Sequence, residues 1–499
     1  MKKDDDKTDE QFLRSHNRSG YSSMVMKFEN FNLMQFVCYF FFYLLVVIVS
    51  LVITSYGPSV TKNSVQTKNV NPKSYEWIIE REISNLERLN QPISSSIQLE
   101  NTKDLIVSAN VFLTVKVYGL PKDSKGVVKP KLLSNSTHKR KIFCKAKAKC
   151  VPIRLMEEPF LRYDSYRVNV LMKRNFTTNF FTKITINWKI RNTKITIFET
   201  FFRYSYLMAS LIIILITTRS CKDIPSGLFS TEQKWIAYLL PCLVLYNNPF
   251  STLSLFIPSP ANDIFQALVS LLFLHLLVLF VLCLIDNHRV PLLQRKWYKF
   301  YLPKILLLTI SFLSIFIVYT KERLKREEDM LYTSIFDFSG IKHIGVLLIL
   351  IVIILIIWIF AGSIITYIKL KKIQTQMKKF KFFLAINFFT FIIFAILFFI
   401  RVGGRKNNTT GIYLSTYTVF NFYIYFLVLA YLPSKQFKSK IHKIIQNSSK
   451  GDTLDQQVID NLNFDGIEKK NKSNLNNDFD MEEIENDQNN DFFLSEKND

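Results

Sequence analysis

The sequence predicts an α-helical polytopic membrane protein with eight transmembrane helices and one β-sandwich domain outside the membrane. Apolar residues, 49% of the 499-residue chain, are segregated into runs long enough to span a bilayer. The first two runs are separated by a segment with alternating, β-type patterning. The eight runs are 31–54, 200–217, 235–257, 264–285, 301–320, 346–368, 382–400 and 412–431. One helix therefore precedes the β-domain and seven follow it.

The chain begins with residues 1–30, which are polar, charged and mixed in sign. This composition is typical of a disordered tail, which we expect in the cytosol. The run 31–54 follows this tail and is too long for the apolar region of a signal peptide. We therefore interpret it as an uncleaved transmembrane signal anchor.

The segment 55–199 is predicted to be a β-rich domain. Its charged stretch 75–89 is expected to be helical, whereas from residue 93 onward apolar and polar residues alternate, as in DLIVSANVFLTVKVYGL. Period-two alternation with turn signals indicates a half-buried antiparallel sheet, and the length suits a small sandwich. Cys144 and Cys150 lie in this segment and are candidates for a disulfide if it is extracytoplasmic; the alternative is two free thiols.

The distribution of basic loops predicts that both termini are cytosolic. The loops 286–304 and 369–381 are rich in Lys and Arg, and a cytosolic N-terminus places both on the inside, as the positive-inside rule requires. The loop 321–340 is the exception, because it is basic and falls outside. The tail 432–499, acidic and Asn-rich in its later part, is expected to be disordered. Candidate glycosylation sequons on the outside begin at Asn135, Asn175, Asn407 and Asn408.

A polar turn interrupts the third span, 235–257. Tyr246, Asn247, Asn248 and Pro249 lie past the middle of this run, and proline removes a helix hydrogen bond, so we expect a kinked or locally unwound helix. Irregular backbone inside a membrane is tolerated where it is buried in protein or lines a wet cavity. The turn is therefore a candidate ligand pocket; the alternative is that its amides bond to neighbouring helices and hold the bundle together.

His275 is the histidine deepest in a predicted span, and it joins this candidate pocket because intramembrane ionisable residues usually point inward. The alternative is a neutral imidazole bonded to a nearby backbone carbonyl. Gln266 and Asn387 are weaker candidates of the same kind.

No catalytic constellation is visible in the sequence. It contains no Walker loop, no HExxH, no GxSxG and no pair of intramembrane aspartates, so we expect a protein that is not an enzyme and that needs no cofactor or metal. The net charge of +24 is spread over loops instead of forming one patch, which argues against nucleic-acid binding.

Several sequence blocks together resemble the transmembrane protein 181 family, whose seven-helix region is similar to that of Wntless. The blocks are FETFFRY at 198–204, EQKWIAYLLPCLVLYNNPF at 232–250, DIFQA at 263–267 and YLPK at 301–304, with YDSYRVNV at 163–170 resembling a strand of the family's luminal domain. The resemblance implies a luminal GOLD-like β-sandwich and a heptahelical bundle arranged like a G-protein-coupled receptor. Asn248 stands where an acidic residue is expected in the family's YNDP turn, and STLSLF follows where a more apolar continuation is expected.

In function, the resemblance implies a Golgi, endosomal or plasma-membrane protein that binds a luminal or lipidated ligand and sorts or escorts it. The alternatives are a heptahelical signalling or toxin-binding receptor and, less favoured, a small-molecule transporter, for which two halves with paired broken helices are expected. The expected partners are membrane lipid, a luminal ligand and a trafficking coat recruited by Phe492 and Phe493.

Overall fold

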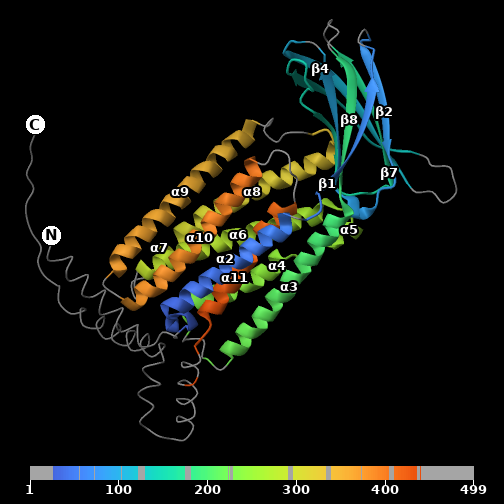
Figure 1. Ribbon diagram of the computed structural model, residues 1–499. Helices are drawn as coiled ribbons and strands as arrows, with labels where there is room; N and C mark the ends of the chain where they lie inside the picture. Colours follow the sequence, from blue (N-terminus) through green and yellow to red (C-terminus); the bar gives the residue numbers. More distant parts are fainter. Residues whose placement is uncertain are drawn as a thin grey trace, which may run out of the picture.

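The computed structural model has a β-sandwich standing on one end of a helical bundle (Figure 1). It describes residues 26–434, except 56, 72–73, 103, 122–129, 175–180, 223, 225–228, 290–295, 333–338, 372–373 and 404–409, together with residue 439. Most of the predicted tails 1–30 and 432–499 lies outside the described residues, namely 1–25, 435–438 and 440–499. Outside them also lie Asn175, Asn407, Asn408, Phe492 and Phe493.

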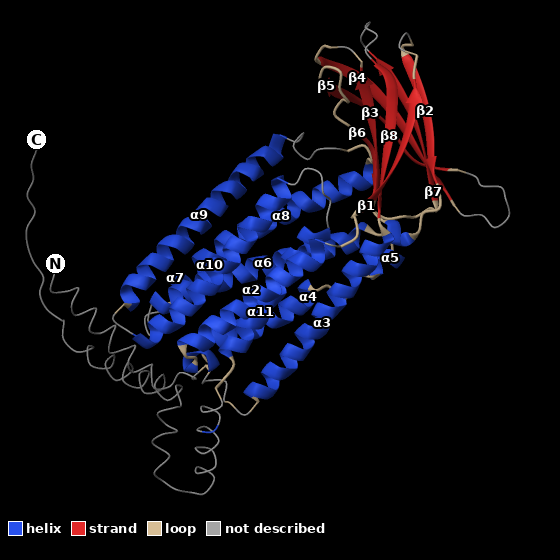
Figure 2. Cartoon of the chain, viewed as in Figure 1, coloured by secondary structure: helices blue, strands red, loops and turns tan. Residues whose placement is uncertain are grey.

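The β-domain consists of two four-stranded antiparallel sheets, drawn red in Figure 2. The strand orders are β1-β8-β3-β6 and β2-β7-β4-β5. The strands are β1 (Thr61–Asn69), β2 (Glu76–Ile83), β3 (Ile93–Asn101), β4 (Val107–Leu120), β5 (Lys131–Cys144), β6 (Ile153–Glu158), β7 (Ser165–Arg174) and β8 (Phe181–Arg191).

The alternating sequence pattern places one face of each central strand in a shared core. Tyr166, Phe181 and Trp188 are among the largest fully buried side chains, and residues of β3 alternate strictly between buried and half-buried. Cys144, at the end of β5, is bonded to Cys150, as predicted. The fold class predicted from the sequence is thus confirmed for this domain.

The prediction of a helix over residues 75–89 is wrong, because β2 occupies Glu76–Ile83. Its Glu and Arg residues favour a helix locally. However, Trp77, Ile79 and Ile83 are buried in the sandwich core, and the strand pairs with β7 over its whole length. Tertiary pairing therefore overrides helix propensity. The polar edge strand β1 was also missed, since its sequence TKNSVQTKN lacks a buried apolar face.

The eight apolar runs predicted from the sequence correspond to helices of the bundle. Of the described helices, α3, α6, α8, α9, α10 and α11 are long and apolar enough to cross a membrane, and α2 contains a shorter apolar stretch. The helices are α2 (Leu33–Ser55), α3 (Thr193–Cys221), α4 (Thr231–Tyr246), α5 (Leu253–Phe256), α6 (Pro260–Arg289), α7 (Trp297–Phe300), α8 (Leu302–Glu328), α9 (Ser339–Leu370), α10 (Gln374–Gly403) and α11 (Thr410–Tyr431).

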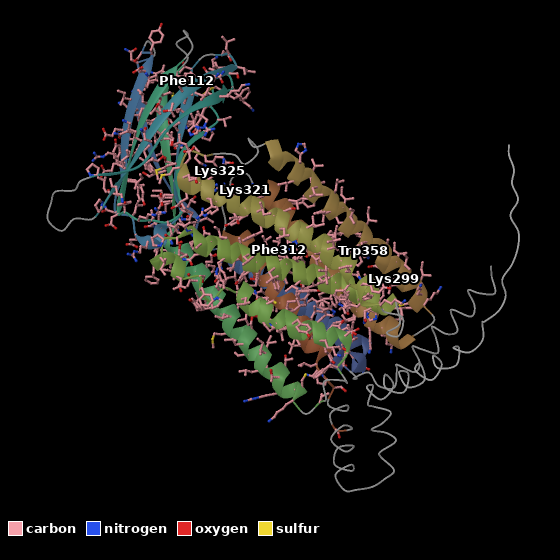
Figure 3. All side chains as sticks on the ribbon, turned by 180° about the vertical axis from the view of Figure 1, so that it is seen from behind. Phe112, Lys299, Phe312, Lys321, Lys325 and Trp358 are labelled. Atoms are coloured by element: carbon pink, nitrogen blue, oxygen red, sulfur yellow. A yellow bond between two sulfur atoms is a disulfide. The ribbon has the colours of Figure 1, made fainter. Side chains whose placement is uncertain are left out.

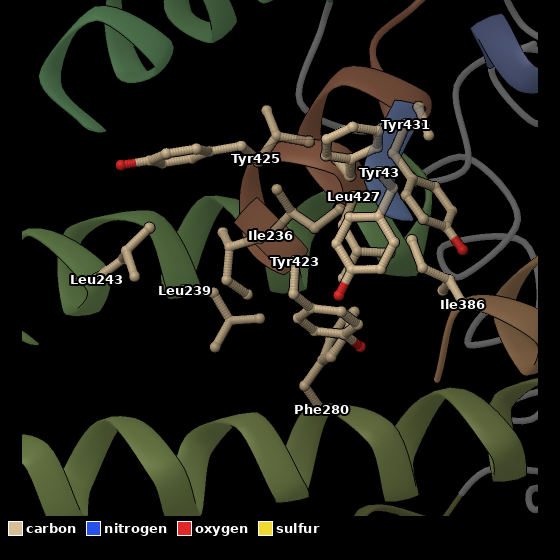
Figure 4. Close-up of a cluster of buried hydrophobic side chains, with 14 of the residues drawn as sticks. Tyr43, Ile236, Leu239, Leu243, Phe280, Ile386, Tyr423, Tyr425, Leu427 and Tyr431 are labelled. Carbon is tan, nitrogen blue, oxygen red and sulfur yellow. The ribbon is translucent and has the colours of Figure 1, made fainter. Parts of the chain in front are cut away.

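Helix α11 is the most buried of the spanning helices, and α9 is the least buried. Around α11 pack α2, α3, α4 and α10. Figure 4 shows part of their shared core, in which Tyr43 of α2, Ile236 of α4, Phe280 of α6 and Tyr423 of α11 lie together. The N-terminal helix is therefore an integral part of the bundle.

The bundle and the sandwich are joined first by a direct strand-to-helix transition. Strand β8 ends at Arg191 and α3 begins at Thr193, with the Asn192 side chain accepting a hydrogen bond from the Lys194 amide at 3.2 Å as the N-cap. The Asn192 amide also donates to the Ser59 carbonyl at 3.1 Å, which ties in the segment between α2 and β1.

The second junction is made by α8, which continues past the bundle to the sandwich. Lys321 and Lys325 lie at this end of the helix, close to the strands, whereas Lys299 lies at the far end of the bundle (Figure 3). Arg162 of the β-domain pairs with Glu327, and Arg326 pairs with Glu157 at 3.2 Å. Arg326 and Glu327, two charged residues of the exceptional loop 321–340, thus join the helical bundle to the β-domain.

Beyond α8, residues 329–332 form a docking segment that enters the sandwich core. The side chain of Leu331 is completely buried among core residues. Asp329 accepts hydrogen bonds from Ser136 Oγ at 3.0 Å and lies 2.8 Å from His138 Nε2, while Arg140 Nη2 donates to the Leu331 carbonyl at 2.7 Å. A segment of the helical domain therefore completes the β-domain.

Glu158, at the end of β6, is the buried carboxyl group of this junction. Its pKa is raised to about 7, chiefly by burial and also by the nearby charge of Glu327, whereas Arg162, 3.9 Å away, lowers it. Because the ordinary value is 4.5, the folded protein holds this proton more tightly than the unfolded chain does. The contribution of Glu158 to stability is therefore complete below about pH 4.5 and is lost as the pH rises through 7.

We expect Leu331→Ala to destabilise the β-domain by about 2–5 kcal/mol, because it leaves a cavity in a packed core. Amide hydrogen exchange of the purified protein should show faster exchange in β4, β5 and β7. Leu324→Ala, at an exposed leucine of α8, is the control and should leave exchange unchanged. Equal exchange in both variants would contradict the assignment of Leu331 to the core.

We expect Glu158→Gln to remove one pH-dependent contribution to stability. Relative to the native chain, the variant should gain stability as the pH rises from about 4.5 to 7, and the difference should then level off. Thermal unfolding measured across this pH range checks the prediction. A stability difference between the variant and the native chain that does not change with pH would contradict the prediction.

Candidate functional site

The polar turn predicted from the sequence ends α4. The helix stops at Tyr246, Asn247 is its C-cap and Asn248 has a φ of 49°, in the left-handed region that asparagine tolerates better than most residues. Pro249 follows and cannot continue the ladder because it lacks an N–H. The chain then forms the short helix α5. The predicted local unwinding is thus present, whereas Pro241 lies inside the continuous helix.

Asn247 is the centre of a buried polar network of four residues, which joins three helices. Its side-chain amide donates to Ser210 Oγ of α3 and to Asn421 Oδ1 of α11, both at 2.9 Å. Tyr425 of α11 completes the network, with its hydroxyl 2.8 Å from Ser210 Oγ and 3.2 Å from Asn421 Oδ1. Asn247 and Asn421 are fully buried. This is the interhelical bonding that the alternative interpretation described.

The other residues of the turn also pack against the bundle. The Tyr246 ring stacks on Phe273 and Tyr417, with centroid separations of 4.5 and 4.9 Å. The Asn248 side chain accepts from the Phe250 amide at 3.1 Å, which stabilises the turn itself. Tyr246 therefore belongs to an aromatic cluster, and Asn248 has a local structural role.

A charged cluster lies beside the turn, at the end of the bundle nearest the sandwich. Glu199 of α3 accepts from Arg203 at 2.8 Å and also pairs with Arg191 at the end of β8. In the orientation that satisfies both groups, the Gln266 amide oxygen accepts from Arg203 at 2.9 Å. The FETFFRY and DIFQA blocks therefore meet here. Tyr204 links the cluster to the turn, because its hydroxyl donates to the Pro249 carbonyl at 3.3 Å.

The structure does not bring His275 to the polar turn. Its Nδ1 lies 2.7 Å from the carbonyl of Leu271 in the same helix, and its Nε2 lies 3.3 Å from Ser311 Oγ of α8. The expectation that it faces Asn247 or Asn248 is therefore wrong, because the imidazole is on the face of α6 that packs against α8. Asn387 is also separate, since it accepts from the Tyr423 hydroxyl at 2.9 Å.

A cavity of about 400 Å³ lies at the opposite end of the bundle, between α3, α4 and α11. Its walls are mainly apolar, and we call it the lateral cavity. None of the five predicted pocket residues lines it. Sequence analysis did not predict this cavity, because its walls come from helices that are not all adjacent in the chain.

A second buried charged cluster, near the lateral cavity, was not predicted. Lys304 Nζ of α8 pairs with Asp286 of α6 at 2.8 Å, and His288 Nε2 lies 3.8 Å from Glu232 of α4. All four residues are at most 6% exposed. Glu232 begins the EQKW block and Lys304 ends YLPK, so both signature blocks contribute to this cluster. Charged residues at the ends of adjacent spans were the available signal.

The described residues contain no group of three or more His, Cys, Asp or Glu side chains placed to hold a metal ion. At the polar turn, amides and hydroxyls of the described residues make the hydrogen bonds, and the ion pair of Glu199 with Arg203 lies beside them.

We expect Asn247→Ala to destabilise the bundle by about 1 kcal/mol, since Ser210 and Asn421 lose their shared donor. The melting temperature of the purified protein in detergent measures this. Leu245→Ala, at an exposed position two residues earlier, is the control. If the two variants melt at the same temperature, the network does not stabilise the bundle.

Comparison with known proteins agrees with this two-part architecture. Residues 83–191 match the family model described as the TMEM181 GOLD domain, and residues 192–435 match the Wntless-like transmembrane domain. The boundary between the two matches falls at Asn192, the residue that caps α3.

One relative is the human protein Transmembrane protein 181, to which the chain is 25% identical over 405 residues, covering 76% of this chain and 81% of the relative. The two family matches are contiguous and together run from Ile83, the last residue of β2, to the end of the bundle. The chain therefore belongs to the transmembrane protein 181 family, with a GOLD domain followed by a Wntless-like transmembrane domain.

Proposed function

We propose that the protein is a receptor of the secretory pathway or plasma membrane that binds a luminal or lipidated ligand and sorts or escorts it. The combination of a GOLD domain with a Wntless-like transmembrane domain supports this proposal. In it, the β-domain faces the lumen or cell exterior and recognises the ligand, while the bundle carries the complex through membranes.

The observation that carries the proposal is a direct contact between the β-domain and the segment after the polar turn. Gln91 Nε2, at the base of the sandwich, donates to the Ser254 carbonyl of α5 at 3.1 Å. Its Oε1 accepts from the Leu161 amide at 3.2 Å. Gln91 is buried. Ligand binding that moves the base of the sandwich would therefore act on the broken end of α4.

The proposed orientation has support from the position of the chain ends. The Lys27 amide, before α2, donates to the Leu432 carbonyl, after α11, at 2.9 Å. The start of α2 and the end of α11 therefore lie side by side, at the end of the bundle away from the sandwich (Figure 1). A disulfide in the sandwich suits an oxidising compartment. Asn135 is exposed on the edge strand β5, where an oligosaccharide can be attached.

We expect Asn135 to carry an N-linked glycan in cells. Asn135→Gln should lower the apparent mass on a gel by the mass of one glycan, because the sequon is lost. Glycosidase treatment of the native chain should produce the same decrease at this position. Thr137→Ser is the matched control, since it keeps both the sequon and the hydroxyl that bonds to Thr114. A native chain insensitive to glycosidase at this position would argue against a luminal β-domain.

Sorting activity is tested by comparing the secreted and surface proteomes of cells with and without the protein. We expect one or a few proteins to disappear from the surface and accumulate inside the cell. Re-expression of the native chain should restore them, and Gln91→Ala should restore them less well than Gln66→Ala, a change on the polar edge strand β1.

Two results would count against the proposal. Unchanged delivery of all surface and secreted proteins would contradict escort and favour signalling or toxin binding instead. Full rescue by Gln91→Ala would show that the contact with Ser254 is not used.

A further inference from the structure

The lateral cavity lies on the side of the bundle, between membrane-spanning helices, at the end away from the sandwich. From Gln233 to Pro241 of α4 it extends along roughly 12 Å of helix. Because Ala237 and Tyr238, which line it, are exposed at the bundle surface, the cavity opens toward the surrounding bilayer.

The polarity of the cavity changes along its length. Its outer end, nearest the ends of the helices, is lined by Thr217 and Thr218 of α3 and by Gln233 and Lys234 of α4. Its deeper part is lined by Ile214, Ile236, Leu240 and Pro241. A phospholipid in the adjacent leaflet has the same order, with the polar head at the surface and the acyl chain deeper.

One basic side chain, Lys234, lines the outer end, and two more, Arg219 and Lys222, lie close in sequence to the lining residues Thr218 and Cys221. Lys234 is exposed and has no carboxylate partner among the residues that the structure describes. Lys222 follows Thr218 by four residues at the end of α3 and is also exposed, as is Arg219 in its last turn. Gln233, by contrast, is occupied, because its Nε2 donates to the Tyr431 carbonyl at 2.8 Å. The charge complements an anionic head group.

The wall of α4 is suited to an acyl chain. Ala237 leaves room that a larger side chain would fill, and Pro241 lacks the N–H that would bond to the Ala237 carbonyl. We propose that the lateral cavity binds one anionic phospholipid of the leaflet remote from the β-domain, with its head group at Lys234 and one acyl chain along Ala237 and Leu240. This site is independent of the proposed sorting function.

The test uses the full-length protein in nanodiscs of phosphatidylcholine that contain a trace of phosphatidylserine with a photoactivatable acyl chain. We expect labelling to concentrate on residues 233–241 and to be displaced by unlabelled phosphatidylserine. Ala237→Trp, which fills the cavity, should lower this labelling about tenfold. Thr218→Trp fills the cavity from α3 and tests the same point if the first variant does not fold.

Two further variants separate a specific site from general lipid contact. Lys234→Glu should lower labelling by phosphatidylserine about fivefold, with labelling by an equivalent phosphatidylcholine probe unchanged. Leu245→Trp, outside the cavity on α4, should change neither. The proposal is overturned if the exposed face of α9 is labelled as strongly as residues 233–241 and if neither Ala237→Trp nor Thr218→Trp lowers the labelling. The proposal is also overturned if a photoactivatable free fatty acid labels residues 233–241 and phosphatidylserine does not displace it.

Discussion

The insertion of Leu331 into the core of the sandwich is the contact on which the architecture depends. This side chain belongs to the helical part of the chain, yet it is completely buried among residues of the β-domain. Asp329 and Arg140 fix the backbone on either side of it through hydrogen bonds across the junction. The two domains therefore share one core, and the sandwich cannot move freely on the bundle without exposing apolar surface.

The signature blocks of the sequence gather at the two ends of the bundle. Arg203 and Pro249 lie beside the sandwich, whereas Glu232 and Lys304 lie at the remote end. Buried ionic groups cost free energy to desolvate, so each is compensated by a partner on another helix or one turn away. The lateral cavity lies at the remote end as well, but between α3, α4 and α11, whereas the ion pairs there join α4, α6 and α8.

The sequence predicted the elements much better than their contacts. Hydropathy located the spans, because a bilayer imposes their length, and alternation located strands such as β4 and β8. Residues 75–89 were misassigned because strand pairing, not local composition, decides their conformation. The break after Tyr246 followed from Pro249, but the partners of Asn247 lie on α3 and α11, and the direction of His275 depends on how α6 rotates against α8. Such relations between distant segments have no signature in a single sequence.

The distance between spin labels on the two domains is the most direct test of a shared core. The labelled positions, Lys116 on β4 and Lys321 on α8, are both exposed. The cysteines outside the disulfide (Cys38, Cys221, Cys242 and Cys283) are replaced beforehand, so that the Cys144–Cys150 bond remains. A single narrow distance distribution in lipid nanodiscs is the result expected for domains joined by Leu331. A broad distribution, unchanged when Leu331 is replaced by aspartate, would contradict it.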